Sequence, residues 1–223
     1  MITIACLGNG GRFGNQLFQY AFARAYAESI GAELRTPDWI GRHIFKNINE
    51  EIMTDVAGPS TEYPDSDNVN LDGHFQQPHH LKYLSRSKVK KWFTFKDKLD
   101  IPSYDLVFHK RRGDYIAFSH IFATVTDDSY TRGAQSHGFD PSYALCLDDS
   151  RDQSLIFEDF RLMMNCKNLF RSNSTFAWWA ATLGNCKVYS PIINNKVGII
   201  NADFVKGNDQ PLGIFTGEMK ISK

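Results

Sequence analysis

Residues 105–114 read Asp-Leu-Val-Phe-His-Lys-Arg-Arg-Gly-Asp, an apolar run that ends abruptly in basic residues and a glycine. A short apolar run that stops at a turn signal is typical of a buried strand. A second run, residues 169–171, stops at Ser172 and is followed by helical spacing over residues 175–183. Strands that alternate with helices and end in polar side chains predict an α/β fold, with mostly parallel sheets that bind a ligand at their C-terminal edges.

The same alternation opens the chain. Residues 2–7 form an apolar run before a glycine-rich turn, and residues 15–30 have apolar side chains at helical spacing up to Gly31. The pattern restarts after Pro102, so we predict two domains, residues 1–100 and 101–223. Residues 36–70 have no sustained period and are interpreted as loops with short elements. The other predicted elements are a basic helix over 78–88, strands over 69–75, 90–95, 142–147 and 187–190, and a helix over 157–165.

The overall charge gives no reason to expect nucleic acid as a partner, because 25 basic and 25 acidic side chains cancel. A bound anion must therefore be held by a local cluster. No run approaches the roughly 20 apolar residues of a transmembrane helix, and the N-terminus lacks the basic start of a signal peptide. The four cysteines are widely spaced among apolar residues, which favours buried free thiols. These features predict a soluble cytoplasmic protein.

The basic cluster that follows the strand is the first candidate site. Arg111 and Arg112 come directly after the apolar run and precede Gly113, which places two guanidinium groups at the end of a strand. Arginine suits phosphate because its planar fork donates two parallel hydrogen bonds and stays charged. The alternative is a solvated cluster of charges on a loop.

The second candidate site is the stretch Ser172-Asn173-Ser174-Thr175, which lies between a predicted strand and a predicted helix. Hydroxyl groups and free N–H groups at a helix N-terminus bind anions, assisted by the helix dipole. The alternative is an ordinary helix cap, since the same residue types are the usual capping residues.

Three weaker features suggest other chemistry. The turn at Gly8 to Gly14 lacks the lysine of a phosphate-binding P-loop and the spacing of a dinucleotide fingerprint. Asp65-Ser66-Asp67 matches the DxD pattern of metal-dependent glycosyltransferases, but no apolar strand precedes it. Three histidines (His74, His79 and His80) have no cysteine or carboxylate partners at ligand spacing. We therefore expect no metal site.

Taken together, three segments closely resemble the bacterial α1,2-fucosyltransferases of glycosyltransferase family 11, which are related to α1,6-fucosyltransferases and protein O-fucosyltransferases. The segments are residues 10–23 (GGRFGNQLFQYAFA), 109–115 (HKRRGDY) and 172–181 (SNSTFAWWAA). Two weaker similarities lie at residues 71–76 (LDGHFQ) and at residues 148–149 (DD) followed by residues 158–163 (EDFRLM). The resemblance implies a GT-B-like fold, in which two Rossmann-like α/β/α domains face a donor cleft. The N-terminal domain would be on the acceptor side and the C-terminal domain would bind a GDP-sugar.

The resemblance also implies a role for particular residues. Arg111 would contact the β-phosphate of GDP-fucose as the principal catalytic residue, and Asn15 would face the transferred sugar. The other donor-binding positions that it implies are His109, Arg112, Asp159, Ser174, Thr175 and Gly14. Asp159 would accept hydrogen bonds from guanine. The implied activity is inverting, metal-independent transfer of fucose to a hydroxyl of a glycan acceptor, α1,2 to galactose.

The sequence departs from the pattern of the family that it resembles in two places, and these differences leave alternative functions open. Lys110 replaces the usual apolar residue of the basic motif, and residues 115–140 are compressed compared with typical members. A catalytically reduced GDP-sugar-binding protein, a transferase that uses another GDP-sugar, and an interaction protein with an aromatic surface remain alternatives. The sequence identifies neither the general base, the acceptor nor the oligomeric state.

Overall fold

The computed structural model describes residues 1–148, 151–214 and 216–222. The chain divides into two units, one formed by Met1–Leu99 with Ile221–Lys223 and the other by Asp100–Lys220. The last three residues are thus grouped with the first unit, whereas residues 101–223 were expected to form one domain. Within the first unit, a main-chain hydrogen bond from Arg86 N to Ser222 O holds this end of the chain (2.8 Å).

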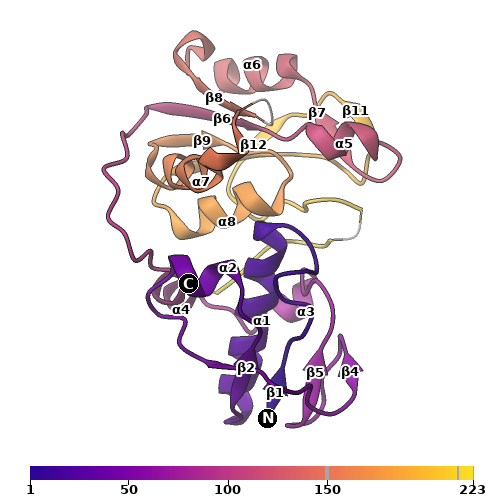
Figure 1. The fold of residues 1–223 in the computed structure, drawn as a ribbon. Helices are drawn as coiled ribbons and strands as arrows, with labels where there is room; N and C mark the ends of the chain where they lie inside the picture. The colour runs from indigo at the N-terminus through magenta and orange to yellow at the C-terminus, as the bar shows by residue number, and fades with distance from the viewer. Residues whose placement is uncertain (149–150, 215, 223) are drawn as a thin grey trace. The chain divides into compact units, whose positions relative to one another are not determined.

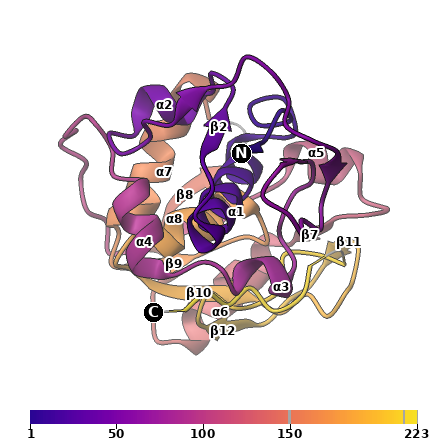
Figure 2. The ribbon, with the colours of Figure 1, turned by 90° about the horizontal axis from the view of Figure 1, so that it is seen from below.

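The first unit is built on a parallel sheet, whose strand order is β3-β2-β1-β5-β4. The strands have only two or three residues each. The longest helix, α1, ends at Gly31, whose φ of 65° is the left-handed conformation that glycine adopts without strain. Figure 1 labels these elements, and α1 is seen nearly end-on beside β2 in Figure 2. The elements are β1 (Ile2–Thr3), α1 (Phe13–Ile30), β2 (Leu34–Thr36), α2 (Ile40–Ile44), β3 (Glu51–Ile52), β4 (Ser60–Thr61), β5 (Val69–Leu71), α3 (Pro78–Leu81) and α4 (Arg86–Trp92).

The second unit has a five-stranded sheet in the order β12-β10-β9-β6-β8, in which only β12 is antiparallel to its neighbour. In Figure 1, α6 lies on one face of this sheet and α7 and α8 lie on the other. A separate parallel pair joins β7 and β11. The elements are β6 (Leu106–Lys110), α5 (Gly113–Ala117), β7 (Ala123–Val125), α6 (Asp127–Ser136), β8 (Leu145–Asp148), α7 (Ile156–Asn165), β9 (Asn168–Phe170), α8 (Thr175–Leu183), β10 (Lys187–Pro191), β11 (Gly198–Ile200) and β12 (Phe204–Lys206). The short 3₁₀ turns Pro141–Tyr143 and Gln153–Leu155 precede β8 and α7.

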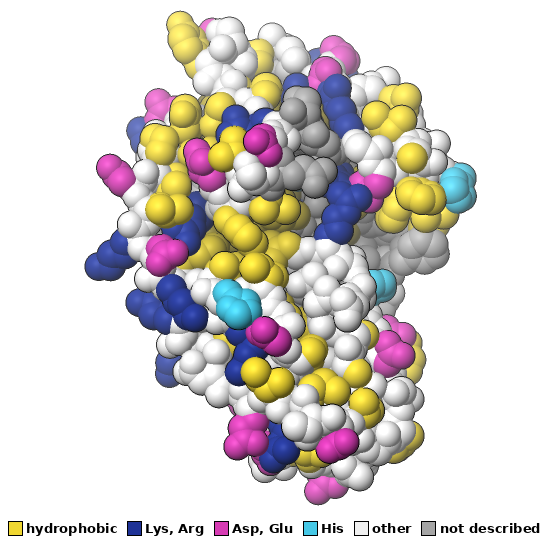
Figure 3. Space-filling view, viewed as in Figure 1, with side chains coloured by type: hydrophobic (Ala, Val, Ile, Leu, Met, Phe, Trp, Pro, Cys, Tyr) yellow, Lys and Arg dark blue, Asp and Glu magenta, His cyan; other side chains and the backbone are white. Residues whose placement is uncertain are grey.

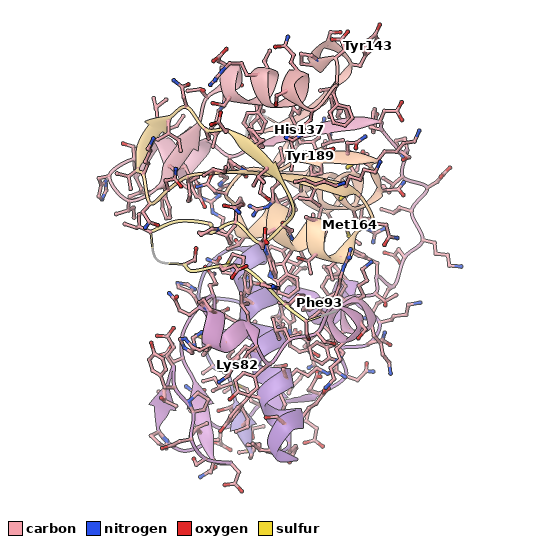
Figure 4. All side chains as sticks on the ribbon, turned by 180° about the vertical axis from the view of Figure 1, so that it is seen from behind. Lys82, Phe93, His137, Tyr143, Met164 and Tyr189 are labelled. Atoms are coloured by element: carbon pink, nitrogen blue, oxygen red, sulfur yellow. The ribbon has the colours of Figure 1, made fainter. Side chains whose placement is uncertain are left out.

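An aromatic core packs between this sheet and α6. Phe170 of β9 is fully buried, and its ring stacks on Tyr189 of β10 with centroids 4.4 Å apart and planes at 11°. The ring of His137 lies 4.6 Å from the same tyrosine, and the two side chains are labelled in Figure 4. Phe108, Tyr130 and Phe204 belong to the same buried cluster. This core holds the central strands of the sheet in place.

The predicted α/β class with mostly parallel sheets is confirmed. The predicted strand over residues 90–95 is wrong, because residues 90–92 belong to α4 and, of the rest, only Phe95 makes an isolated bridge, to Phe45. The oxygen of Ser85 accepts a hydrogen bond from Lys88 N (3.3 Å) and caps that helix, so the predicted basic helix over 78–88 is split into α3 and α4. The predicted strands over residues 2–7 and 69–75 end early, at Thr3 and Leu71.

Two surface properties concern possible partners. Acidic and basic side chains are interspersed over the face shown in Figure 3, as the balanced composition indicates. Among the described residues, no helix combines the length and the apolar character needed to cross a bilayer. All four cysteines are free thiols, as expected, but only Cys166 is buried; Cys6 and Cys186 are partly exposed and Cys146 is exposed, so the expected burial is wrong for these three.

Candidate functional site

The two candidate motifs of the second unit meet at one edge of its sheet. Strands β6 and β9 are parallel neighbours, with Phe108 opposite Phe170. The basic segment Lys110–Arg112 begins at the last residue of β6, and the hydroxyl-rich segment Ser172–Ser174 follows β9. Because parallel neighbours end on the same side, both segments leave the sheet at its C-terminal edge, where ligands of open α/β sheets bind.

A buried hydrogen bond joins the two motifs directly. Nδ1 of His109 lies 2.9 Å from the hydroxyl oxygen of Ser172. The carbonyl oxygen of His109 accepts a hydrogen bond from the phenol of Tyr130 in α6 (2.7 Å). Strand β6 is therefore fixed at its end from both sides, which sets the position from which the following arginines project.

Each arginine of the basic motif is oriented by a carboxylate. Arg111 pairs with Asp114, and its guanidinium lies over the ring of Tyr115, 5.3 Å from the centroid. Its side chain is only 15% exposed. Arg112 pairs with Asp127, the first residue of α6. Side chains held in this way lose little further freedom on binding a ligand, which favours recognition of an anion.

Lys110, the residue that departs from the family pattern, is part of the same arrangement. Its ammonium group lies 2.6 Å from Asp127 Oδ1 and 5.7 Å from the centre of the Tyr130 ring. Hydrogen bonds from Arg112 and Lys110 lower the pKa of Asp127, and the hydrogen bond to Asp127 raises the pKa of Arg112. The substituted lysine therefore makes a contact with α6 that an apolar residue could not make.

His109 is neutral at physiological pH. Burial, with a smaller contribution from the positive charge of Arg111, lowers its pKa to about 3, and Asp148 opposes this shift. A neutral imidazole has one donor and one acceptor nitrogen, so it can bond to Ser172 without adding charge beside the arginines. His109 is thus suited to positioning and hydrogen bonding.

The buried imidazole predicts a pH dependence of stability. In the unfolded chain a histidine titrates near 6.5, whereas folded His109 takes up a proton only near 3. The unfolded state therefore binds more protons between these values. The contribution of the neutral His109 side chain to the free energy of unfolding is complete above about pH 6.5. It is lost as the pH falls towards 3, at about 1.4 kcal/mol per pH unit.

The measurement is the free energy of unfolding as a function of pH for the native protein and the variant His109→Asn. An asparagine amide can still hydrogen bond to Ser172 but does not titrate. We expect the variant to lose less stability between pH 6.5 and 4.5. Equal slopes for the two proteins would contradict the assignment of a buried neutral imidazole.

The hydroxyl-rich segment caps helix α8. The oxygen of Ser174 accepts a hydrogen bond from Phe176 N (3.2 Å), so the residue is the N-cap of the helix. A hydroxyl that accepts one bond still has its own hydrogen to donate. Ser174 is 4% exposed, and Thr175 is the first residue of α8. Capping and anion binding are therefore compatible at this helix start.

Asp159 lies on α7 and is paired with an arginine that the sequence did not point to. Its Oδ1 lies 2.9 Å from Nε of Arg151, and its side chain is 13% exposed. Burial raises the pKa of Asp159, while the charge of Arg151 lowers it. Because a carboxylate has about four acceptor positions, the pairing leaves capacity for further donors.

Gly14 and Asn15 belong to the first unit, near the start of α1. Oδ1 of Asn15 accepts a hydrogen bond from Gln76, the last residue of the weaker similarity at residues 71–76 (3.1 Å). Gly11 has a φ of 108°, and a Cβ there would lie 2.6 Å from Nδ2 of Asn15. The amide of Gln16 donates to the Gly11 carbonyl (3.0 Å). The glycine turn is thus shaped closely around the asparagine side chain.

Arg171 is a buried arginine to which the sequence assigned no role. It is 0% exposed and donates to the carbonyl oxygens of Ser172 and Gln210, both at 3.0 Å. Burial lowers its pKa to about 9, so it remains charged at neutral pH. Its place directly before the segment Ser172–Thr175 was visible in the sequence, but its contact with Gln210 joins residues that are 39 positions apart.

The DxD sequence is not part of this arrangement. Asp65 and Asp67 are exposed and lie between β4 and β5 of the first unit. No group of three or more histidine, cysteine or acidic residues in the described part of the chain is arranged to hold a metal ion.

Comparison with known proteins supports the resemblance. Residues 147–209 match the model of the family described as Glycosyl transferase family 11. The matched range includes the motif at residues 172–181 but not the motifs at residues 10–23 and 109–115. The predicted resemblance is confirmed for this segment. No curated protein sequence matches the chain significantly.

The fold is that of a solved structure. The crystal structure of NodZ alpha-1,6-fucosyltransferase soaked with GDP-fucose matches with a TM-score of 0.52 and 14% identity, over 92% of this chain and 99% of the other. The two chains share a GT-B-like α/β fold.

Proposed function

We propose that the protein is an inverting glycosyltransferase that moves fucose from GDP-fucose to a hydroxyl group of a glycan acceptor, α1,2 to galactose, in the cytoplasm. The observation that carries this proposal is the buried hydrogen bond between His109 and Ser172, because it joins the basic motif to the hydroxyl-rich helix start. The family 11 segment and the fold that the chain has in common with a fucosyltransferase support it.

The proposed reaction makes its largest demand at the leaving group. The acceptor oxygen bonds to C1 of fucose as the bond from C1 to the β-phosphate oxygen breaks, and the electron pair leaves with GDP. The proton of the acceptor hydroxyl passes to the released phosphate, directly or through solvent. Negative charge therefore builds on the β-phosphate, and fixed cations and hydroxyl donors stabilise it most.

In this proposal Arg111 binds the β-phosphate, since its side chain is already oriented by Asp114 and Tyr115. Arg112 and His109 contact the diphosphate and the nucleoside, and Ser174 and Thr175 donate at the helix start. Asp159 accepts from the two donors on one edge of guanine. Gly14 and Asn15 contact the transferred sugar.

The test is an assay of GDP-fucose hydrolysis and transfer over a panel of oligosaccharide acceptors, read by mass spectrometry, with GDP binding measured by calorimetry. Transfer to a galactose-terminated acceptor is the expected result. Binding of GDP-fucose without turnover would replace the proposal by a GDP-sugar-binding protein. Turnover of another GDP-sugar would change the donor, and the absence of any GDP binding would contradict the whole proposal.

We expect transfer to be independent of divalent metal ions. Arginine and N–H donors supply the positive charge that Mg²⁺ or Mn²⁺ supplies in other transferases. The measurement is the transfer rate with excess EDTA, and after addition of MgCl₂ or MnCl₂. A rate that is lost in EDTA and restored by one of these ions would show that the proposed leaving-group stabilisation is incomplete.

A further inference from the structure

A pocket of about 140 Å³ opens on the first unit, and none of the residues that line it has a role in the proposed reaction. Its walls come from three parts of this unit: Phe22 of α1, the segment Glu62–Pro64 after β4, and α3 with the following Lys82 and Tyr83. Lys82 is labelled in Figure 4. The pocket therefore combines aromatic rings with one acidic and one basic side chain.

The aromatic walls present ring faces to solvent. The ring of Tyr63 stacks on His79, with centroids 5.4 Å apart and planes at 22°. Because Tyr63 is still 65% exposed, its other face is open. Tyr83 is 38% exposed and meets Phe22 edge-on (5.6 Å, 83°). Exposed tyrosine rings held by neighbouring rings are suited to stacking against a ligand with an apolar face and polar edges.

His80, which lines this pocket, has a buried ring nitrogen that no described residue hydrogen bonds. The residue is 2% exposed, and its Nε2 lies 3.4 Å from the carbonyl oxygen of Glu62. Burial lowers the pKa of His80 to about 4, so the ring is neutral at physiological pH. If Nε2 carries the hydrogen, Nδ1 is an acceptor, and no described residue donates a hydrogen bond to it. An unsatisfied buried acceptor is costly unless a ligand or water donates to it.

The shape of the pocket depends on a glycine of the segment at residues 71–76. A Cβ added at Gly73 would lie 2.8 Å from Cγ of Glu62. The stem of Glu62 therefore packs directly over this glycine, which sets where its side chain lies. This contact accounts for part of a segment to which the proposed reaction assigns no role, and whose Gln76 donates a hydrogen bond to Asn15.

We propose that this pocket binds a saccharide ring, with the C–H face of the sugar against the tyrosines and its hydroxyl groups bonded to Glu62, Lys82 and His80. A hydroxyl group both donates and accepts, so it suits a pocket that offers an anionic acceptor, a cationic donor and a neutral ring nitrogen. A cationic ligand is disfavoured because the Lys82 ammonium already lies 5.3 Å from the Tyr83 ring centre. A free anion is disfavoured by Glu62. That the sugar belongs to the acceptor glycan rests on the proposed function.

The experiment is saturation-transfer NMR of the full chain without GDP, with methyl β-galactoside and methyl β-N-acetylglucosaminide as probes. We expect saturation transfer from the native protein, and a loss of affinity of about three- to tenfold in Tyr63→Ala. Tyr143→Ala is the matched control, because Tyr143 lies in the second unit and is 80% exposed. Glu62→Gln keeps the shape of the side chain and is expected to weaken binding without abolishing it.

Binding of GDP to each variant is measured in parallel, and it reports both folding and the proposed donor site. A saturation-transfer NMR signal from the sugars that is weakened in Tyr63→Ala but not in Tyr143→Ala supports the proposal. A protein that binds GDP but gives no saccharide signal, or whose signal is unchanged in Tyr63→Ala, overturns the pocket and leaves the proposed function standing. Binding of tetramethylammonium in place of the sugars also overturns it. Failure of GDP binding with intact saccharide binding overturns the proposed function alone.

Discussion

Replacement of Arg111 by alanine is expected to lower the rate of fucosyl transfer at least about 100-fold, because one well-placed charge-assisted donor is worth roughly 2–4 kcal/mol at a developing negative charge. The side chain is only 15% exposed and is held by Asp114 and Tyr115, so its charge is preorganised. Removing it leaves Asp114 partly exposed to solvent, and we expect the fold to survive. The measurement is kcat/KM for GDP-fucose with a saturating acceptor.

Two variants show whether the loss is specific. Arg111→Lys keeps the charge but loses the bidentate fork, so its rate is expected to fall between those of the alanine variant and the native protein. Arg132→Ala removes an arginine of α6 that is 50% exposed and pairs with Asp128, its neighbour one turn earlier. This change is expected to leave the rate unchanged. Near-native turnover by a folded Arg111→Ala protein would remove Arg111 from the proposed mechanism.

Replacement of Phe170 by alanine is expected to lower the free energy of unfolding of the second unit by about 3–5 kcal/mol. The ring is fully buried between Tyr189 and Phe204, at centroid distances of 4.4 and 5.2 Å. Its removal leaves a cavity that these rigid aromatic rings cannot fill. Denaturant unfolding followed by tryptophan fluorescence is suitable, because Trp178 and Trp179 are buried in this unit.

Phe118 is the control, since it is 49% exposed and Phe118→Ala is expected to change stability by less than about 0.5 kcal/mol. Phe170→Leu, which fills more of the cavity, is expected to lose less than the alanine variant. Equal stability losses for Phe170→Ala and Phe118→Ala would contradict the stacked core as the source of the stability of this unit.

The parts of the fold that were predicted well are those with a strong local signal. Helix α8 runs from Thr175 to Leu183 as predicted, because capping residues precede a compact apolar stretch. Helix α1 ends at its predicted glycine. The predictions failed where elements are very short or pair at long range. Strands β7 and β11 are 73 residues apart and three residues long, which is too short for a two-residue period to be recognised.

The sequence alone determined the α/β class and the two motifs of the second unit, because strand ends, helix caps and clustered arginines are encoded by neighbouring residues. Only the tertiary structure decided which carboxylate each arginine pairs with, that His109 and Arg171 are buried, and that Tyr63, Tyr83 and His80 surround one pocket. These features depend on desolvation and on contacts between residues far apart in the chain. No local pattern carries that information, because burial is a property of the packed chain as a whole.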